Sequence, residues 1–263
     1  MYAENFFYNG EMLSDYGFII GSFDGSDLTE QTTGSIITFN RMPYSSGRKY
    51  SLINIQYDSC FEFTFDVVKA GTDKIITGEE YRDIAKWLNR KAFYPFRFID
   101  DIEAYDVWFN ASFNVNQLVY AGHIVGIRLT MITDTPYGYG DEITQRCDFT
   151  TNTAKKIYIE SDDYGFFIPD IIITCKADGN ISLYNQTAGQ TMQIANCTNN
   201  EVITIKGKEQ IITSSINHNV YDDFNYSFLK IGNTADNPYN VIVSQGAANV
   251  TDIIYKPVIK NIV

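Results

Sequence analysis

Segment 135–140, with the sequence Thr-Pro-Tyr-Gly-Tyr-Gly, most constrains what this 263-residue chain can fold into. Its proline lacks a backbone N–H and its glycines favour turns, so the segment interrupts the strand patterns that lie on both sides of it. A chain of this length accommodates two domains of ordinary size. We therefore predict two domains, residues 1–136 and residues 137–263.

The composition favours β-structure. Aromatic residues make up 15% of the chain, with 19 Tyr and 18 Phe, and such rings suit the half-buried, pleated surface of a sheet. Hydrophobic residues reach 44% and charged residues 20%, which is ordinary for a globular protein with a packed core. The predicted fold class is mainly β.

In the first domain, an alternating pattern indicates antiparallel strands. Its clearest example is the strand with Phe61, Phe63, Phe65 and Val67 on one face and mainly polar residues on the other. Further strands are predicted at 6–8, 16–20, 36–40, 96–99, 107–115 and 123–132. Segments 22–35 and 43–48 are polar and are predicted to be loops.

One helix is predicted, at 78–89. Thr77 and Glu80 have the spacing of a capping box, in which each side chain accepts a hydrogen bond from a backbone N–H at the helix start. An apolar stripe follows at helical spacing, formed by Tyr81, Ile84, Ala85 and Leu88. We expect this stripe to pack on the sheet of the first domain, which would then resemble a β-sandwich with one helix.

The second domain has short strands at close spacing, with turns such as 178–180 and 206–208, and no helical pattern. This arrangement predicts a β-sandwich. The expected strands are 156–159, 171–175, 181–185, 192–194, 201–205, 210–212, 226–231, 239–243 and 250–256, with a turn around 236–238.

The charge distribution argues against nucleic-acid binding. The net charge is −12, and both domains are acidic, with 11 basic and 18 acidic residues in 1–136 and 9 and 14 in 137–263. Phosphate recognition draws on clustered Lys and Arg. The polar, acidic start of the chain and the lack of a long apolar run predict no export signal and no membrane insertion, so we expect synthesis in the cytoplasm.

The cysteines are Cys60, Cys147, Cys175 and Cys197. They form no C-x-x-C pair and are accompanied by two histidines, so a zinc site is not expected and no metal or cofactor is predicted. We expect reduced thiols that are buried or half-buried. A disulfide between Cys175 and Cys197 is the alternative.

A search for catalytic residues gives no constellation, and no enzyme is predicted. His123 and His218 are far apart in sequence and lack a nucleophile motif, so structural or solvent-exposed roles are expected. Glu79 and Glu80 are explained by the helix start. The remaining pairs, Asp24 with Asp27, Asp162 with Asp163 and Asp222 with Asp223, are placed in loops, where a calcium site or a glycosidase pair is the less favoured interpretation. Gly122 and Gly126 lack the flanking pattern of a phosphate loop.

Sugar stacking would require exposed aromatic rings. Trp87 and Trp108 both fall in the first domain, and core packing is their expected role. In the sandwich, the candidates are Tyr158, Tyr164, Tyr184 and Tyr221.

The order of these features resembles the distal tail protein (Dit) family of long-tailed bacteriophages. The matching features are the opening at 6–10 and 16–18, the lone helix ahead of strand 96–98, the junction, and, in the sandwich, segment 165–170, hairpin 178–185 and strand pair 201–212. The resemblance covers nearly the whole chain.

The resemblance implies a non-enzymatic structural protein at the tail tip of a siphophage virion. An N-terminal domain would form a homohexameric ring, a hub that joins the tail tube protein to tail-tip, baseplate or receptor-binding proteins for host adsorption. A galectin-like or carbohydrate-module-like C-terminal sandwich would project outward, where it could carry adsorption proteins or contact cell-surface carbohydrate. The alternative function is a bacterial-surface carbohydrate-binding protein, and a glycan hydrolase ranks last.

Overall fold

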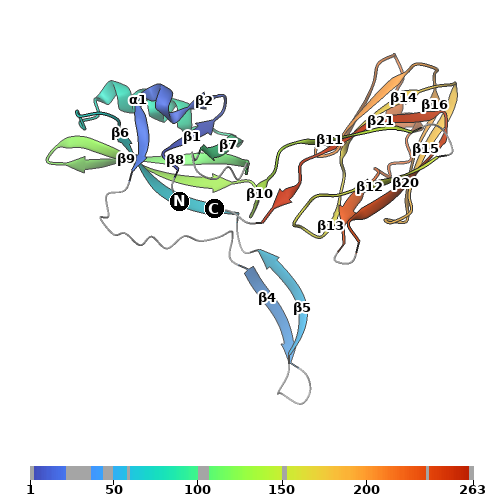
Figure 1. The fold of residues 1–263 in the computed structure, drawn as a ribbon, viewed down its shortest axis with the longest axis horizontal. Coiled ribbons are helices and arrows are strands. Elements are labelled where there is room, and N and C mark those ends of the chain that lie inside the picture. Colours follow the sequence, from blue (N-terminus) through green and yellow to red (C-terminus); the bar gives the residue numbers. More distant parts are fainter. Residues whose placement is uncertain are drawn as a thin grey trace. The chain divides into compact units, whose positions relative to one another are not determined.

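The computed structural model divides into two compact units, Met1–Gly140 with Ile259–Val263 and Asp141–Val258. It describes residues 3–21, 37–43, 50–57, 60–99, 107–149, 153–234 and 237–260. Each unit has its own sheets and its own hydrophobic core (Figure 1). Residues 137–140 and Ile259 belong to the first unit. We had predicted that they belong to the second domain.

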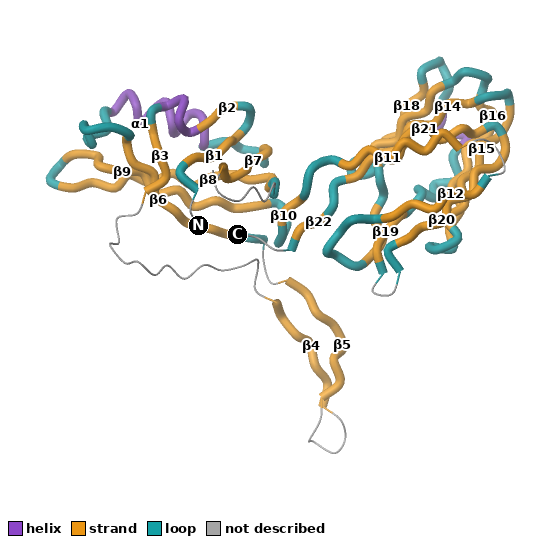
Figure 2. Tube along the Cα trace, viewed as in Figure 1, coloured by secondary structure: helices purple, strands orange, loops and turns teal. Residues whose placement is uncertain are grey.

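The first unit is built on a seven-stranded antiparallel sheet, in the order β2-β1-β7-β8-β9-β6-β3 (Figure 2). Its strands are β1 (Asn5–Tyr8), β2 (Glu11–Met12), β3 (Phe18–Gly21), β6 (Glu62–Lys69), β7 (Tyr94–Ile99), β8 (Phe109–Tyr120) and β9 (His123–Thr133). The alternation predicted for 61–68 is confirmed for Phe61, Phe65 and Val67, which are buried, and for Glu62 and Thr64, which are exposed. Asp66, predicted on the polar face, is instead buried, where the Arg128 guanidinium donates to its carboxylate at 2.8 Å.

Helix α1 (Gly78–Leu88) begins as predicted. The hydroxyl of Thr77 accepts a hydrogen bond from the Glu80 backbone N–H at 3.2 Å, and the Glu80 carboxylate accepts one from the Thr77 backbone N–H at 2.8 Å. The Lys69 ammonium lies 2.7 Å from the same carboxylate. That hydrogen bond, with those from Thr77, lowers the pKa of Glu80 to about 2.

The buried face of α1 is wider than the predicted stripe. Ile84 and Leu88 are fully buried and Tyr81 is half-buried, but Trp87 also points into the core. Its indole N–H donates to the backbone carbonyl of Tyr8 at 3.1 Å. The expected core role of Trp87 is therefore confirmed.

Three predictions for the first unit need correction. Tyr16 lies in a 3-10 helix, η1 (Leu13–Tyr16), and Gly17 has a left-handed φ of 76°, so the strand begins at Phe18 instead of Tyr16. A second correction is a strand that the sequence patterns missed, β5 (Tyr50–Tyr57), which pairs antiparallel with β4 (Ile37–Pro43). The third correction concerns the predicted loop 43–48, because its first residue, Pro43, ends β4. Residues 44–48 and the predicted loop 22–35 lie outside the described residues.

The second unit contains two main antiparallel sheets with a shared core, as predicted for a sandwich (Figure 1). The strands of the five-stranded sheet are, in order, β11 (Ile143–Phe149), β21 (Ala248–Tyr255), β14 (Asp170–Cys175), β17 (Val202–Lys206) and β18 (Ile211–Ser214). Those of the four-stranded sheet are β12 (Ala154–Tyr158), β20 (Tyr239–Gly246), β15 (Gly179–Asn185) and β16 (Gln190–Cys197). A smaller ladder of the second unit joins β13 (Gly165–Phe167) to β19 (Ile231–Asn233). Strand β10 (Gly138–Tyr139), which belongs to the first unit, pairs with β22 (Val258–Ile259).

Two predictions for the second unit are wrong. Residues 220–223 form a short helix, α2 (Val220–Asp223), where a loop was expected. The strand predicted at 226–231 begins only at Ile231, because Tyr226 has a positive φ of 54° and the Gln190 side chain bonds the backbone of Phe228 and Lys230 in place of a strand partner. Asp236, in the predicted turn, lies outside the described residues.

We predict that Leu88→Ala destabilises the protein by about 2–5 kcal/mol, because it leaves a cavity between α1 and the sheet. Urea unfolding measures the loss, and Arg82→Ala, on the exposed face of the same helix, is the matched control. A loss below about 0.5 kcal/mol for Leu88→Ala would show that the site tolerates truncation like a surface position.

We propose that the two units fold as separate domains. Limited proteolysis of the full chain should then cut between residues 133 and 150, and a fragment of residues 141–263 should unfold cooperatively when heated. An unfolded fragment beside a folded full-length chain would contradict this proposal.

Candidate functional site

The second unit buries a carboxylate, that of Glu201, in the turn between β16 and β17. Its side chain is 0% exposed. One carboxylate oxygen, Oε1, accepts a hydrogen bond from Ser214 Oγ at 2.7 Å and lies 2.7 Å from His218 Nδ1. The other, Oε2, accepts a hydrogen bond from the Thr198 backbone N–H at 2.8 Å. These donors offset the cost of burying the carboxylate.

His218 links Glu201 to helix α2. Its Nε2 lies 3.0 Å from Asp223 Oδ2, while the other oxygen of Asp223 accepts a hydrogen bond from the Asn196 side-chain amide at 2.7 Å. Burial acts to lower the pKa of His218, but the hydrogen bonds to Glu201 and Asp223 outweigh burial and raise it. Burial acts to raise the pKa of Glu201, and bonds from Ser214, Thr198 and His218 lower it overall.

This network is not arranged for nucleophilic catalysis. A triad requires one histidine nitrogen to face a nucleophile, whereas both nitrogens of His218 face carboxylates. The Ser214 hydroxyl donates to Glu201 instead of to the imidazole. Its two bonds to carboxylates fit the structural role expected for His218. His123, the other histidine, is exposed at the start of β9.

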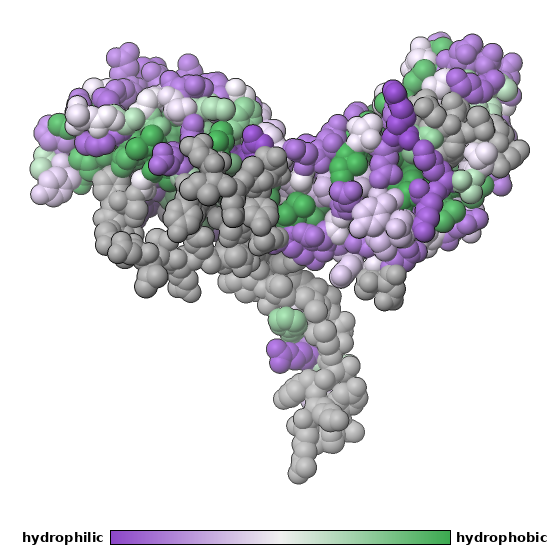
Figure 3. Space-filling view, viewed as in Figure 1, coloured by the Kyte–Doolittle hydropathy of each residue, from purple (hydrophilic) through white to green (hydrophobic). Residues whose placement is uncertain are grey.

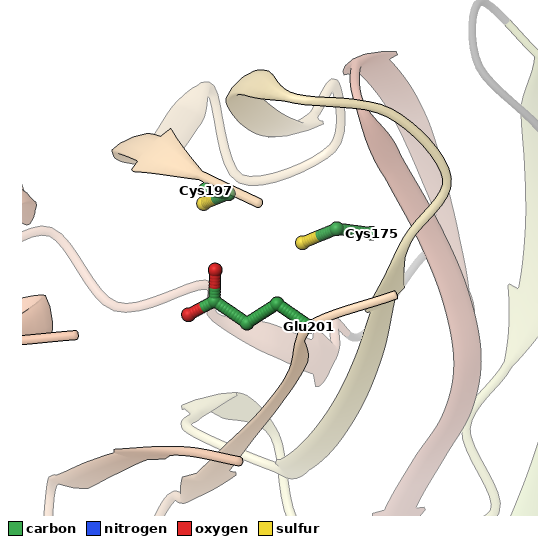
Figure 4. A group of neighbouring side chains, drawn as sticks. All are labelled: Cys175, Cys197 and Glu201. Carbon is green, nitrogen blue, oxygen red and sulfur yellow. The ribbon is translucent and has the colours of Figure 1, made fainter. Parts of the chain in front are cut away.

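Two thiols lie beside the buried carboxylate. Cys175 Sγ, Cys197 Sγ and a Glu201 oxygen all lie within 4.8 Å of one another, and Figure 4 shows the three side chains as neighbours. A hydrogen bond with the Cys175 thiol, together with burial, raises the pKa of Cys197. All four cysteines are free thiols; Cys147 is also buried, but Cys60 is exposed, contrary to expectation.

Among the described residues, the other paired carboxylates belong to no group of three metal-ligating side chains. Glu80 caps α1 while Glu79 is exposed beside it. Asp222 accepts a hydrogen bond from the Asn219 side chain at 2.6 Å, so it does not share the partners of Asp223. Asp162 is exposed, and its backbone N–H donates a hydrogen bond to the carbonyl of Val258. Asp163 is half-buried, and its backbone N–H donates to Ser161 Oγ. Asp24 and Asp27 lie outside the described residues.

Aromatic rings gather on the outer face of the four-stranded sheet. Tyr158 and Tyr239 pair across β12 and β20 with ring centroids 5.3 Å apart, and the Lys156 ammonium lies 3.6 Å from the Tyr239 ring centroid. Tyr184 pairs with Val243, four residues from Tyr239, and so lies half-buried on the same face. The sequence analysis identified Tyr158 and Tyr184 but missed Tyr239 and Lys156. Alternation within one strand does not show which residues of another strand lie beside it, so it could not place Tyr239 next to Tyr158.

The other aromatic candidates lie outside the strands of the four-stranded sheet. Trp108 is half-buried in the first unit, with the Arg97 guanidinium 4.7 Å from its ring centroid. Tyr164 is exposed ahead of β13, and the Tyr221 hydroxyl accepts a hydrogen bond from the Ile212 backbone N–H at 2.9 Å. In the view of Figure 3, hydrophilic and hydrophobic surface residues are interspersed. None of the helices in the described ranges combines the length and apolar character needed to cross a membrane.

We predict that His218→Ala destabilises the second unit by about 3–5 kcal/mol, because it removes the partner of a buried carboxylate. His123→Ala is the matched control and should change stability by less than about 0.5 kcal/mol, since His123 is exposed. Equal effects of the two substitutions in urea unfolding would show that the buried network does not stabilise the fold.

Comparisons with known proteins agree with this architecture. Residues 1–135 match a family model described as a phage tail protein N-terminal domain, and residues 137–255 match one described as a phage tail C-terminal domain. A comparison with curated protein sequences finds no match.

Several solved chains resemble this one, and two are described here. The crystal structure of SPP1 Dit (gp 19.1), titled a paradigm of the hub adsorption apparatus in phages that infect Gram-positive bacteria, is 12% identical, with a TM-score of 0.69 over 97% of this chain and 98% of that one. The phage P2 baseplate in its activated conformation with Ca is 10% identical, with a TM-score of 0.47 over 94% and 99%. The chain thus belongs to a phage tail protein family, and its predicted mainly β architecture is the fold of a distal tail protein.

Proposed function

We propose that the chain is the distal tail hub of a siphophage, a homohexameric ring that joins the tail tube to the tail tip or baseplate and to the adsorption apparatus. The observation that carries the proposal is the fold likeness to SPP1 Dit, which extends over 97% of this chain. Family matches in both halves support a tail role for the whole chain. The hub acts as a structural part, without catalysis, and is made in the host cytoplasm before it enters the virion.

Exposed apolar side chains of the first unit support assembly through that unit. Val119 is 60% exposed and Tyr120 is 76% exposed, both near the tip of the β8–β9 hairpin. Other exposed apolar residues among those described in the first unit are Met12, Ile19, Phe39, Met42, Ile75 and Phe93. In a closed ring, each copy uses two complementary surfaces, so contacts between copies and with the tail tube protein or baseplate proteins would cover such side chains.

The mass of the purified protein in solution tests the proposal, alone and after mixing with the tail tube protein of the same phage. We expect a closed homohexamer in at least one of the two conditions. A monomer in both would remove the hub proposal and favour a surface-binding protein that needs no ring.

We predict that the ring does not retain DNA. Because each chain carries a net charge of −12, the assembled ring repels the DNA that a tail conduit must let pass. Binding to duplex DNA should be absent in fluorescence anisotropy at low salt, about 50 mM, where phosphate contacts are strongest. Micromolar binding that weakens steeply with added salt would contradict the prediction.

We further propose cell-surface carbohydrate as a partner of the second unit, bound at the outer face with Tyr158 and Tyr239. Sugar sites combine aromatic rings with a few polar groups, and this face offers both, including Lys156. Tyr158→Ala should weaken binding to purified host-wall polysaccharide by about tenfold or more, or about 1.4 kcal/mol. Tyr120→Ala, an exposed tyrosine of the other unit, is the control; an equal effect of both would rule out this face.

A further inference from the structure

The cluster of Cys175, Cys197 and Glu201 brings metal-ligating atoms together inside the second core. The three residues are 0%, 2% and 1% exposed, respectively, in a core formed mainly by Ile, Leu and Met side chains. They come from three different places in the chain, namely the end of β14, the end of β16 and the residue before β17. Two thiols and a carboxylate are the donor types that zinc takes in proteins.

A bulge in β16 turns Cys197 toward this cluster. Ile194 pairs with Ile181 and Cys197 pairs with Gly179, so β16 has one more residue than β15 between the two pairs. Asn196 within this stretch has a positive φ of 54°. Simple alternation from the buried Met192 and Ile194 would place Asn196 inside, whereas the bulge places Cys197 there.

The carboxylate is held in place and keeps a free lone pair. Oε1 of Glu201 is bonded by Ser214 and His218, but among the described residues Oε2 accepts a hydrogen bond only from Thr198 N–H. The carboxylate has four lone pairs and accepts these three hydrogen bonds, so it retains one lone pair for a metal ion. Hydrogen bonds that orient a ligand in this way are usual around protein metal sites.

We propose that Cys175, Cys197 and Glu201 bind one zinc-type divalent ion, and that Ser214 and His218 position the carboxylate. Sulfur ligands at about 2.3 Å from a tetrahedral zinc lie about 3.8 Å from each other, so the observed cluster needs to contract by no more than about 1 Å. Three protein ligands leave one position for a water molecule or an outside donor.

Each thiol releases its proton to solvent when it binds, so the two thiolates neutralise the two positive charges of the ion and the Glu201 carboxylate adds one further negative charge. The weak S–H hydrogen bonds of Cys197 to the carbonyls of Ile194 and Ala195, at 3.7 and 3.6 Å, are replaced by a metal–sulfur bond. A hard cation such as calcium or magnesium does not suit the site, because it takes oxygen ligands.

The first test uses the full-length protein, purified under reducing conditions without chelator. Elemental analysis should find about one zinc per chain. After the metal is removed by a chelator, Co²⁺ should restore a thiolate-to-cobalt charge-transfer absorption, which reports sulfur bound to the ion.

Five variants then locate the site. Cys175→Ser and Cys197→Ser should each abolish the cobalt absorption, while Cys147→Ser, a buried thiol outside the cluster, and Cys60→Ser should keep it. Ser214→Ala should retain the absorption but weaken cobalt affinity by about 10- to 100-fold, because it loosens the carboxylate.

Two results for the wild-type chain would overturn the proposal. If the protein contains no metal and develops no cobalt absorption while four thiols react after unfolding, the cluster is ordinary core packing. If two thiols are missing and no metal is present, Cys175 and Cys197 form a disulfide instead. Should a cysteine variant fail to fold, the wild-type cobalt spectrum and thiol count still decide between these outcomes.

Discussion

The stacking of Phe6 on Trp87 joins the first strand of the chain to its main helix, and the first unit is organised around it. The two rings are 5.6 Å apart and almost parallel, and Phe6 also contacts Phe65, Phe96 and Phe113 at 5.3–6.0 Å. These rings come from β1, α1, β6, β7 and β8, so one aromatic cluster connects elements that lie far apart in sequence. Aromatic pairs add specific geometry to the burial of apolar area, which defines where α1 sits on the sheet.

The second unit depends on a different constraint, a charge that must be satisfied inside an aliphatic core. Glu201 obtains its hydrogen bonds from Thr198, Ser214 and His218, and His218 in turn holds Asp223. Because His218 bonds Glu201, the segment between β18 and α2 has to lie against the core. Helix α2 follows directly and provides Asp223 as the second partner of His218. A polar network with all of its members satisfied favours one arrangement of these segments over others.

Local patterns predicted much of the fold, because their causes are local. The capping box of Thr77 and Glu80 and the alternation around Phe61 act over a few residues, and both are present. The errors have longer-range causes. The strand predicted at 226–231 is replaced by irregular backbone because Gln190, 38 to 40 residues away in sequence, provides its hydrogen bonds. Trp87 widens the buried face of α1 because a carbonyl of β1 accepts its indole N–H.

The candidate site was harder to predict than the fold, for a reason that applies to β-sandwiches in general. Metal-binding motifs such as C-x-x-C describe ligands on one tight turn, where closeness in sequence produces closeness in space. In a sandwich, ligands from strands of two sheets meet across the core whatever the length of the intervening chain, as Cys175 and Cys197 do. Strand alternation could have identified the inward position of Cys175, but it places Cys197 outside, because the bulge at Asn196 is not visible in the pattern of apolar residues. Wide cysteine spacing is therefore weak evidence against a metal site in a chain predicted to form a sandwich.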